Sequence, residues 1–192
     1  MGVTNVDFQC GDAQHFELEA RLYDLIYSRF GVMFFDNPVA AFTRMRGALA
    51  KNGRLVFVCW QPIIKNQWIS EPLNIVSKYI ESAEQPNSEA PGPFSFSEPS
   101  KVRETLTKAG FTKIEISAYN CSVNFGERAV DAAHFLTQMG PTASAISSVE
   151  PSSKFFTSIL NELEQAIAPY LTSKGIMLGA ATWIVTARNP LA

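Results

Sequence analysis

Two short polar loops hold the residues of this chain that are best placed to do chemistry. Each loop follows a segment that we expect to form a strand, Val3–Cys10 or Tyr23–Tyr27. In doubly wound α/β folds, ligands bind beyond the carboxyl ends of the strands, so both loops are candidate ligand contacts. The candidate residues are Asp12, Ala13 and Gln14 in the first loop and Ser28, Arg29 and Phe30 in the second.

Several of these residues also have a purely structural interpretation. Asp12 follows Gly11 and can simply close a turn. Phe30 can be a buried side chain in a tight turn that includes Gly31. His15, beside the first loop, is interpreted as an exposed loop histidine and not as a catalytic base. No catalytic residue is therefore assigned from the sequence.

The sequence lacks the motifs of several other chemistries. It contains no G-x-G motif, no phosphate-binding loop and no Ser/His/Asp arrangement. Cys10, Cys59 and Cys121 are far apart and form no C-x-x-C pair, so we expect neither a zinc site nor a disulfide framework. No metal ligand is assigned, and thiols kept reduced favour a cytoplasmic protein.

The composition is that of a globular protein with few charges. Its 192 residues fit one domain of ordinary size, so we expect a single domain over residues 1–192. Charged residues make up 18%, against about 25% in typical proteins, which leaves apolar surface for a partner or an apolar ligand to cover. The net charge of −2 and the lack of a basic run argue against nucleic acid as the main partner. The sequence contains no uncharged, apolar window of about 18 residues, so it predicts no membrane span.

The best-defined structure in the sequence is a strand–helix–strand unit. Tyr23–Tyr27 is a compact apolar run, and Asn37 followed by Pro38 is typical of a helix start. We expect this helix to end at Asn52-Gly53. Arg54–Trp60 is apolar almost throughout, as in a strand covered on both faces. A βαβ unit of this kind predicts parallel strands.

The rest of the chain predicts more helices, a long loop and two further strands. Residues 61–97 contain a helix over Ser70–Ala83 and a Pro- and Ser-rich loop, and together we interpret them as a lid or insert. The remaining elements expected are a helix from Ser97 to Ala109, a strand over Phe111–Ala118, helices over Arg128–Met139 and Ser153–Leu171, and a strand over Ala181–Ala187.

Four stretches in this order resemble class I S-adenosylmethionine-dependent methyltransferases of the ubiquinone/menaquinone-biosynthesis type. The most specific stretch is the strand–helix–strand unit with its Asp-Asn-Pro helix start and Asn-Gly-Arg turn. The four stretches read NVDFQCGDAQ, YDLIYSRFGVMFFDNPVAAFTRMRGALAKNGRLVFVCW, KVRETLTKAGFTKIEIS and AATWIVTA. Together they span nearly the whole chain.

The resemblance implies an α/β, Rossmann-like methyltransferase fold with helices on both faces of the sheet. It places Tyr23–Tyr27, Arg54–Trp60, Ala181–Ala187 and Phe111–Ala118 side by side in that order, with Ala181–Ala187 antiparallel. The family's first two strands and its glycine-rich cofactor loop would precede Val3. We therefore expect a truncated fold, made of the C-terminal part of a methyltransferase.

The resemblance also implies S-adenosylmethionine as the cofactor and methyl transfer to a small or lipophilic acceptor. Asp12 and Ala13 match the family's adenine site, where a carboxylate accepts from the adenine amine and a backbone N–H donates to a ring nitrogen. The loop after Tyr27 would face the methyl group. Trp60, Trp68 and Phe94 lie where the family builds its substrate pocket or lid, although ordinary core filling explains aromatic residues equally well.

Loss of the family's first strands would leave the strand Tyr23–Tyr27 as an exposed, apolar sheet edge. Such an edge invites pairing with another chain. We expect a homodimer through this edge, or a partner chain that supplies the missing half. Three functions remain open: a methyltransferase that is incomplete on its own, a non-catalytic, self-associating scaffold derived from one, and a binder of apolar small molecules that uses the aromatic residues of the lid region.

Overall fold

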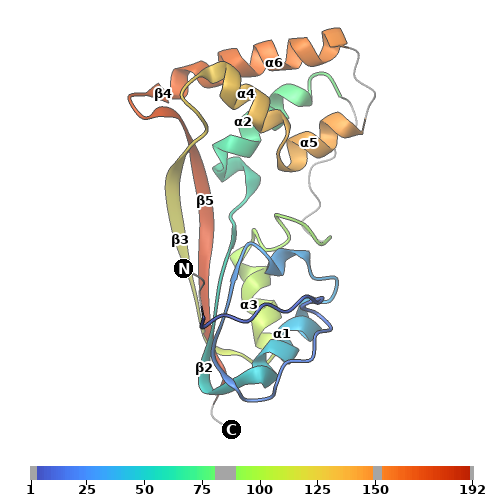
Figure 1. The fold of residues 1–192 in the computed structure, drawn as a ribbon, viewed down its shortest axis with the longest axis vertical. Helices are drawn as coiled ribbons and strands as arrows, with labels where there is room; N and C mark the ends of the chain where they lie inside the picture. Colours follow the sequence, from blue (N-terminus) through green and yellow to red (C-terminus); the bar gives the residue numbers. More distant parts are fainter. Residues whose placement is uncertain (1–3, 81–89, 149–152, 191–192) are drawn as a thin grey trace.

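The computed structural model describes residues 4–80, 90–148 and 153–190, and it is built on one mixed β-sheet (Figure 1). The strands lie in the order β1 (Tyr23–Arg29), β2 (Leu49–Trp60), β5 (Gly175–Arg188) and β3 (Thr112–Asn124), and the two-residue strand β4 (Leu171–Thr172) also pairs with β5. β1 and β2 run parallel, while β5 runs antiparallel to both β2 and β3. The expected α/β sheet, its strand order and its reversed last strand are confirmed.

The expected strand over Val3–Cys10 is wrong for the part that the structure describes. Residues 6–10 form no regular element, and the nearest backbone hydrogen bonds belong to a turn, in which His15 and Phe16 both donate to the Asp12 carbonyl. Alternating residues alone do not make a strand, because a strand also needs a neighbour with which to pair its backbone groups. Asp7 further interrupts the alternation.

Helix α1 (Pro38–Ala48) joins the two parallel strands, and its start follows the sequence closely. The Asn37 side chain accepts a hydrogen bond from the Ala40 backbone N–H, and Pro38 is the first helical residue. The predicted stop at Asn52-Gly53 is wrong, because the helix ends at Ala48 and β2 begins at once. Asn52, with φ of 63°, lies where the register between β1 and β2 shifts. Its Asn-Gly pair therefore forms an irregularity in a strand and not a helix end.

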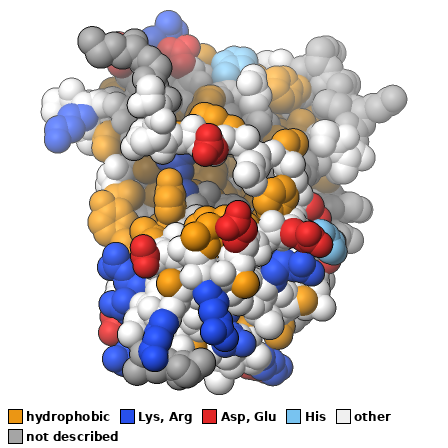
Figure 2. Space-filling model, turned by 60° about the horizontal axis from the view of Figure 1, so that its bottom comes forward, with side chains coloured by type: hydrophobic (Ala, Val, Ile, Leu, Met, Phe, Trp, Pro, Cys, Tyr) orange, Lys and Arg blue, Asp and Glu red, His pale blue; other side chains and the backbone are white. Residues whose placement is uncertain are grey.

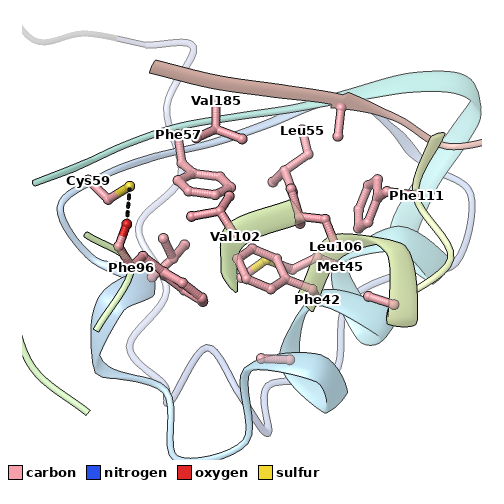
Figure 3. Packing of buried hydrophobic residues seen from close by; sticks show 14 of the residues in the cluster. Phe42, Met45, Leu55, Phe57, Cys59, Phe96, Val102, Leu106, Phe111 and Val185 are labelled. Carbon is pink, nitrogen blue, oxygen red and sulfur yellow. Dashed lines mark hydrogen bonds between the residues drawn. The ribbon is translucent and has the colours of Figure 1, made fainter. Parts of the chain in front are cut away.

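Two hydrophobic clusters pack on opposite faces of β5. The lower cluster joins Val185 and Ala187 to β2 and to helices α1 and α3 (Pro99–Lys108), as Figure 3 shows. The upper cluster joins Ile176, Leu178 and Ala180 to the remaining helices. These helices are α2 (Gln67–Val76), α4 (Ala129–Thr137), α5 (Gly140–Ser147) and α6 (Ser153–Ile167). Because odd and even residues of a strand face opposite ways, the sheet carries helices on both faces, at different ends.

Three amide side chains connect the two clusters where β2 ends. Beyond Trp60, β2 no longer pairs with the backbone groups along this part of β5. The residues that follow Trp60 bond to those backbone groups through their side chains. The Ala181 N–H donates to Asn66 Oδ1 and the Gly179 N–H donates to Gln67 Oε1, each at 2.8 Å. Gln61 Nε2 donates to the Thr182 carbonyl, also at 2.8 Å. These amides take over the pairing that a longer β2 would have supplied.

The remaining boundaries differ from the sequence predictions by a few residues. The helix expected over Ser70–Ala83 spans Gln67–Val76, and the one expected after Ser97 begins at Pro99 with Glu98 as N-cap. Short 3-10 helices cover Val32–Phe34, Ile63–Lys65 and Ala168–Tyr170. Of residues 61–97, positions 81–89 lie outside the described residues. In the described parts of the chain, no helix is both long and apolar enough to cross a membrane.

Candidate functional site

A half-open hollow of about 440 Å³ lies between the N-terminal segment and the outer side of β1. Ala13 and Ser28, one from each candidate loop, are in its wall. The full lining is Gln9, Gly11, Ala13, Phe16, Leu18, Tyr23, Ile26, Tyr27, Ser28, Gly31, Val32, Phe35 and Met45. None of these residues carries a charge. The hollow therefore suits a flat, largely apolar group with a few hydrogen-bonding positions.

The first candidate loop is held by its own polar side chains. The Asp12 carboxylate accepts from the Gln14 backbone N–H and pairs with His15 Nδ1, each at 2.9 Å. The hydrogen bond from Gln14, and then that from His15, holds the pKa of Asp12 below its usual value. Gln14 Oε1 accepts from the Asn37 N–H at 3.0 Å, which ties the loop to the start of α1. Asp12 thus closes a turn, beside the hollow and not in its wall.

Gly11 lets the loop fold tightly onto the next apolar side chain. A Cβ placed at Gly11 would lie 2.3 Å from Cδ2 of Phe16, closer than two carbon atoms approach without a bond. Phe16 lines the hollow, so the glycine sets the depth of its wall. A larger residue at position 11 would push the aromatic ring away.

The second candidate loop turns sharply at the carboxyl end of β1. Phe30 has φ of 60°, which is strained for a residue other than glycine. Its N–H donates to the Val58 carbonyl, and the Gly31 N–H donates to Ser28 Oγ at 3.3 Å. Ser28 and Gly31 line the hollow, whereas Arg29 is exposed and neither it nor Phe30 is among the lining residues.

The strained turn brings the Phe30 ring into contact with Trp60, which in turn contacts Trp68. Phe30 stacks on Trp60 with ring centroids 4.2 Å apart, and Trp60 contacts Trp68 at 5.1 Å. Trp68 and Phe94 are buried in the upper cluster, and none of the three predicted substrate contacts lines the 440 Å³ hollow. Trp68 Nε1 is buried without a hydrogen-bond partner among the described residues. In this structure Trp68 and Phe94 fill the core, and Trp60 packs against them.

Sequence reasoning missed most of the apolar wall of the hollow. Phe16, Leu18, Ile26, Val32 and Phe35 all line it. Phe16 and Leu18 alternate in a segment too short to read as a strand, and that alternation is the signal that could have marked them. Val32 begins the 3-10 helix Val32–Phe34 and Phe35 directly follows it, and so short an element has no distinct hydrophobic period.

In the described parts of the chain we find no metal-binding group of side chains, and the buried thiol of Cys59 is not reactive. Among residues 4–80, 90–148 and 153–190, no group of three or more His, Cys, Asp or Glu side chains could hold a metal ion. Cys59 is buried, and burial raises the pKa of its thiol to about 12. Its Sγ donates to the Phe96 carbonyl at 3.6 Å (Figure 3). Cys59 is therefore a core residue and an inert thiol.

Comparison with known proteins relates the chain to methyltransferases. Residues 2–57 match the family model described as a methyltransferase domain. That segment contains both candidate loops, β1, α1 and most of β2. No curated protein matches the chain.

Solved structures share the fold at low sequence identity. A methyltransferase-like protein from Bacillus halodurans is 16% identical, with a TM-score of 0.52, and the match covers 94% of this chain and 70% of that one. The YcgJ protein from Bacillus subtilis is 13% identical, with a TM-score of 0.54, over 99% of this chain and 74% of that one. Phosphoethanolamine N-methyltransferase 2 from Haemonchus contortus is 15% identical, with a TM-score of 0.44, over 93% of this chain and only 36% of its own length. The first two matches show a Rossmann-like methyltransferase fold.

Proposed function

We propose that this chain is an S-adenosylmethionine-dependent methyltransferase-like protein that binds the adenine end of its cofactor in the 440 Å³ hollow. The observation that carries this proposal is the joint placement of Ala13 and Ser28 in one apolar wall, within the segment that matches a methyltransferase domain. In this proposal the Ala13 N–H would donate to a ring nitrogen of adenine. Asp12 lies beside it and would accept from the exocyclic amine.

The residues of the hollow fit only part of the cofactor. Apolar walls from Phe16, Ile26 and Phe35 suit a purine ring. Among the residues that the structure describes, the lining offers no carboxylate to the ribose hydroxyls and no cation to the methionine carboxylate. When bound, the cofactor supplies an activated methyl group, and the protein mainly has to align the acceptor with it. We therefore expect weak binding by this chain, and a small or lipophilic acceptor beside Phe30 and Trp60.

Calorimetric titration with S-adenosylhomocysteine tests this proposal. Ala13→Tyr should fill the hollow and weaken binding by at least about tenfold. Ala20→Tyr adds the same side chain at another exposed position, outside the lining, and should leave the affinity within about twofold. Absence of any saturable heat, or an equal loss in both variants, would contradict the adenine site.

One observation favours the second function, a self-associating scaffold. β1 is a terminal strand of the sheet, and it exposes 42% of Leu25 and 76% of Tyr27. Antiparallel pairing of two copies about Ile26 would place Leu25 opposite Tyr27 and Asp24 opposite Ser28, with no like charges facing each other. An edge of this kind is self-complementary about a two-fold axis.

Sedimentation velocity at micromolar concentration tests the pairing of two copies through β1. We expect a dimer that the double substitution Leu25→Lys with Tyr27→Lys converts to monomer, because it sets positive charges opposite one another across the axis. Tyr119→Lys, an exposed aromatic site on β3, serves as the control and should stay dimeric. If the parent protein were monomeric, the proposed pairing through β1 would be wrong, and the cofactor proposal would be unaffected.

A further inference from the structure

A second, polar hollow of about 690 Å³ is lined by the last residues of β5 and by parts of β2 and β3. Figure 1 shows this end of the sheet at the bottom of the view. The second hollow shares no lining residue with the apolar hollow. Its lining consists of Asn52, Arg54, Val56, Thr112, Lys113, Glu115, Thr186, Ala187, Arg188, Asn189 and Pro190. These positions come from β2, β3, β5 and the two residues that follow β5, so no local motif in the sequence marks them.

The charges around this second hollow are mostly positive. Arg54, Lys113 and Arg188 line it together with a single carboxylate, Glu115. Among the described residues, none of these four charged side chains forms an ion pair. Arg188 Nη1 donates instead to the Asn52 carbonyl at 3.0 Å. Figure 2 shows Lys and Arg side chains gathered over this lower end of the molecule.

The strand register sets two of the cations against each other. Arg54 of β2 is the direct cross-strand partner of Arg188 of β5, so both side chains project from the same face. Like charges directly opposite each other in an antiparallel pair destabilise it. An anion held between the two guanidinium groups would turn this unfavourable pair into a favourable one.

Strained backbone borders the same hollow on two sides. Asn52 has φ of 63° and Lys113 has φ of 49°, and both residues line it. Each lies at an irregularity in strand register, one between β1 and β2 and one between β3 and β5. Bulges re-aim side chains and are frequent beside functional sites, where residues in strained conformations also gather.

We propose that this second hollow binds a small, multiply charged anion of phosphate chemistry. Two arginines offer forked donors to phosphate oxygens, and Lys113 adds a third cation. The volume lies within the range of small-molecule sites. Glu115 leaves an excess of two positive charges, which a pyrophosphate group would neutralise.

Calorimetric titration with inorganic pyrophosphate in about 150 mM salt tests the proposal, because that salt screens non-specific attraction. We expect one saturable site with a Kd below about 1 mM. Arg54→Gln should weaken binding by at least about tenfold. Arg44→Gln, on an exposed position of α1 outside the hollow, should leave the Kd within about twofold.

A second variant separates binding from folding. Lys113→Gly removes a cation and also relieves the backbone at φ of 49°, so it should raise the melting temperature while it weakens pyrophosphate binding. Absence of saturable binding, or an equal loss in Arg44→Gln and Arg54→Gln, would overturn the proposal. S-adenosylhomocysteine binding should be the same in all three variants, so this result stands apart from the cofactor site.

Discussion

The lower and upper clusters share β5 but are organised by different kinds of contact. The lower cluster is built on a strand–helix–strand unit, and Asn37 caps its helix α1 through a side-chain hydrogen bond. The upper cluster rests on the other end of β5, and its helices α2, α4 and α5 begin without a side-chain cap bond. Local signals therefore specify the strand–helix–strand unit of the first cluster. Packing between distant segments specifies the second cluster and also positions α3 in the first, because α3 begins without a side-chain cap bond.

Cavity-forming substitutions should produce the largest effects and show whether the two clusters unfold together. Phe42 is fully buried and its ring contacts those of Phe35, Phe57 and Phe96. Phe42→Ala should lower the free energy of unfolding by about 3–5 kcal/mol, and Leu163→Ala in the upper cluster by about 2–5 kcal/mol. We propose one domain, so urea titration should give one transition in both variants.

Whether the clusters unfold together is decided by comparing the unfolding curves from two spectroscopic probes. Near-ultraviolet circular dichroism follows the aromatic rings, and far-ultraviolet dichroism follows the helices. If Leu163→Ala separated the two curves, the clusters would be independent units and the single-domain proposal would be wrong.

The amide junction between the clusters should give the next largest effect. Asn66→Ala removes the acceptor of the buried Ala181 N–H and the donor to the Gln61 carbonyl. We expect a loss of about 1–3 kcal/mol in the free energy of unfolding. Asn74→Ala, an exposed position on the same helix, is the control and should change it by less than about 0.5 kcal/mol. Similar losses in both would mean that the junction adds nothing beyond helix propensity.

Capping substitutions should act in opposite directions in the two clusters. Asn37→Ala deletes the cap of α1 and should cost about 1 kcal/mol. Arg128→Ser at the uncapped start of α4 places a hydroxyl three residues before Asp131, and we expect a gain of about 0.5 kcal/mol. The exposed Arg128–Asp131 ion pair lost in the process contributes little. Thermal unfolding of the two variants should therefore shift in opposite senses.

Acid should destabilise the upper cluster by protonating Glu162, which bonds to Lys78 and Tyr79 at the surface. Lys78, and then Tyr79, bond to Glu162 and lower the pKa of its carboxyl, which ties α6 to the end of α2. Because the pKa of Glu162 is lower in the folded state, its interactions stabilise the fold at pH values above 4.5, the pKa of the unfolded state. This stabilisation is lost as the pH falls through the pKa of the folded state. Glu162→Gln should flatten the dependence of unfolding on pH as the pH falls below 4.5. Glu164→Gln removes a carboxyl from the same helix and serves as the matched control.

The sheet was predictable from the sequence because its strands are apolar runs with clear borders. β1, β2 and β5 contain the segments that the sequence indicated, β3 contains all of its segment except Phe111, and Asn37-Pro38 marked the start of α1. The strand over Val3–Cys10 failed because its pairing depends on a neighbour and not on its own residues. Asn52-Gly53 misled because the same dipeptide suits a helix end and a bulge, and only the register between strands decides.

The candidate site was predictable only at its loops. Ser28 was predicted because ligands gather where strands of this fold end, and it follows most of β1. Ala13 also lines the hollow, although the strand expected before it is absent from residues 6–10, so the role of both residues stays a prediction. Trp68 and Phe94 were interpreted as substrate contacts, but aromatic type alone does not separate a pocket wall from a core. The cations of the second hollow, Arg54 and Arg188, are joined only by strand pairing, and sequence patterns do not encode that contact.

The position of β5 in the chain has a consequence for how the protein is made. Both clusters and three other strands need this one strand, yet its residues are 175–188. Residues 175–188 must therefore leave the ribosome before either cluster can close. Until then, the apolar faces of α1, α3 and α6 stay open to solvent, a state that chaperones recognise and that favours aggregation at high synthesis rates.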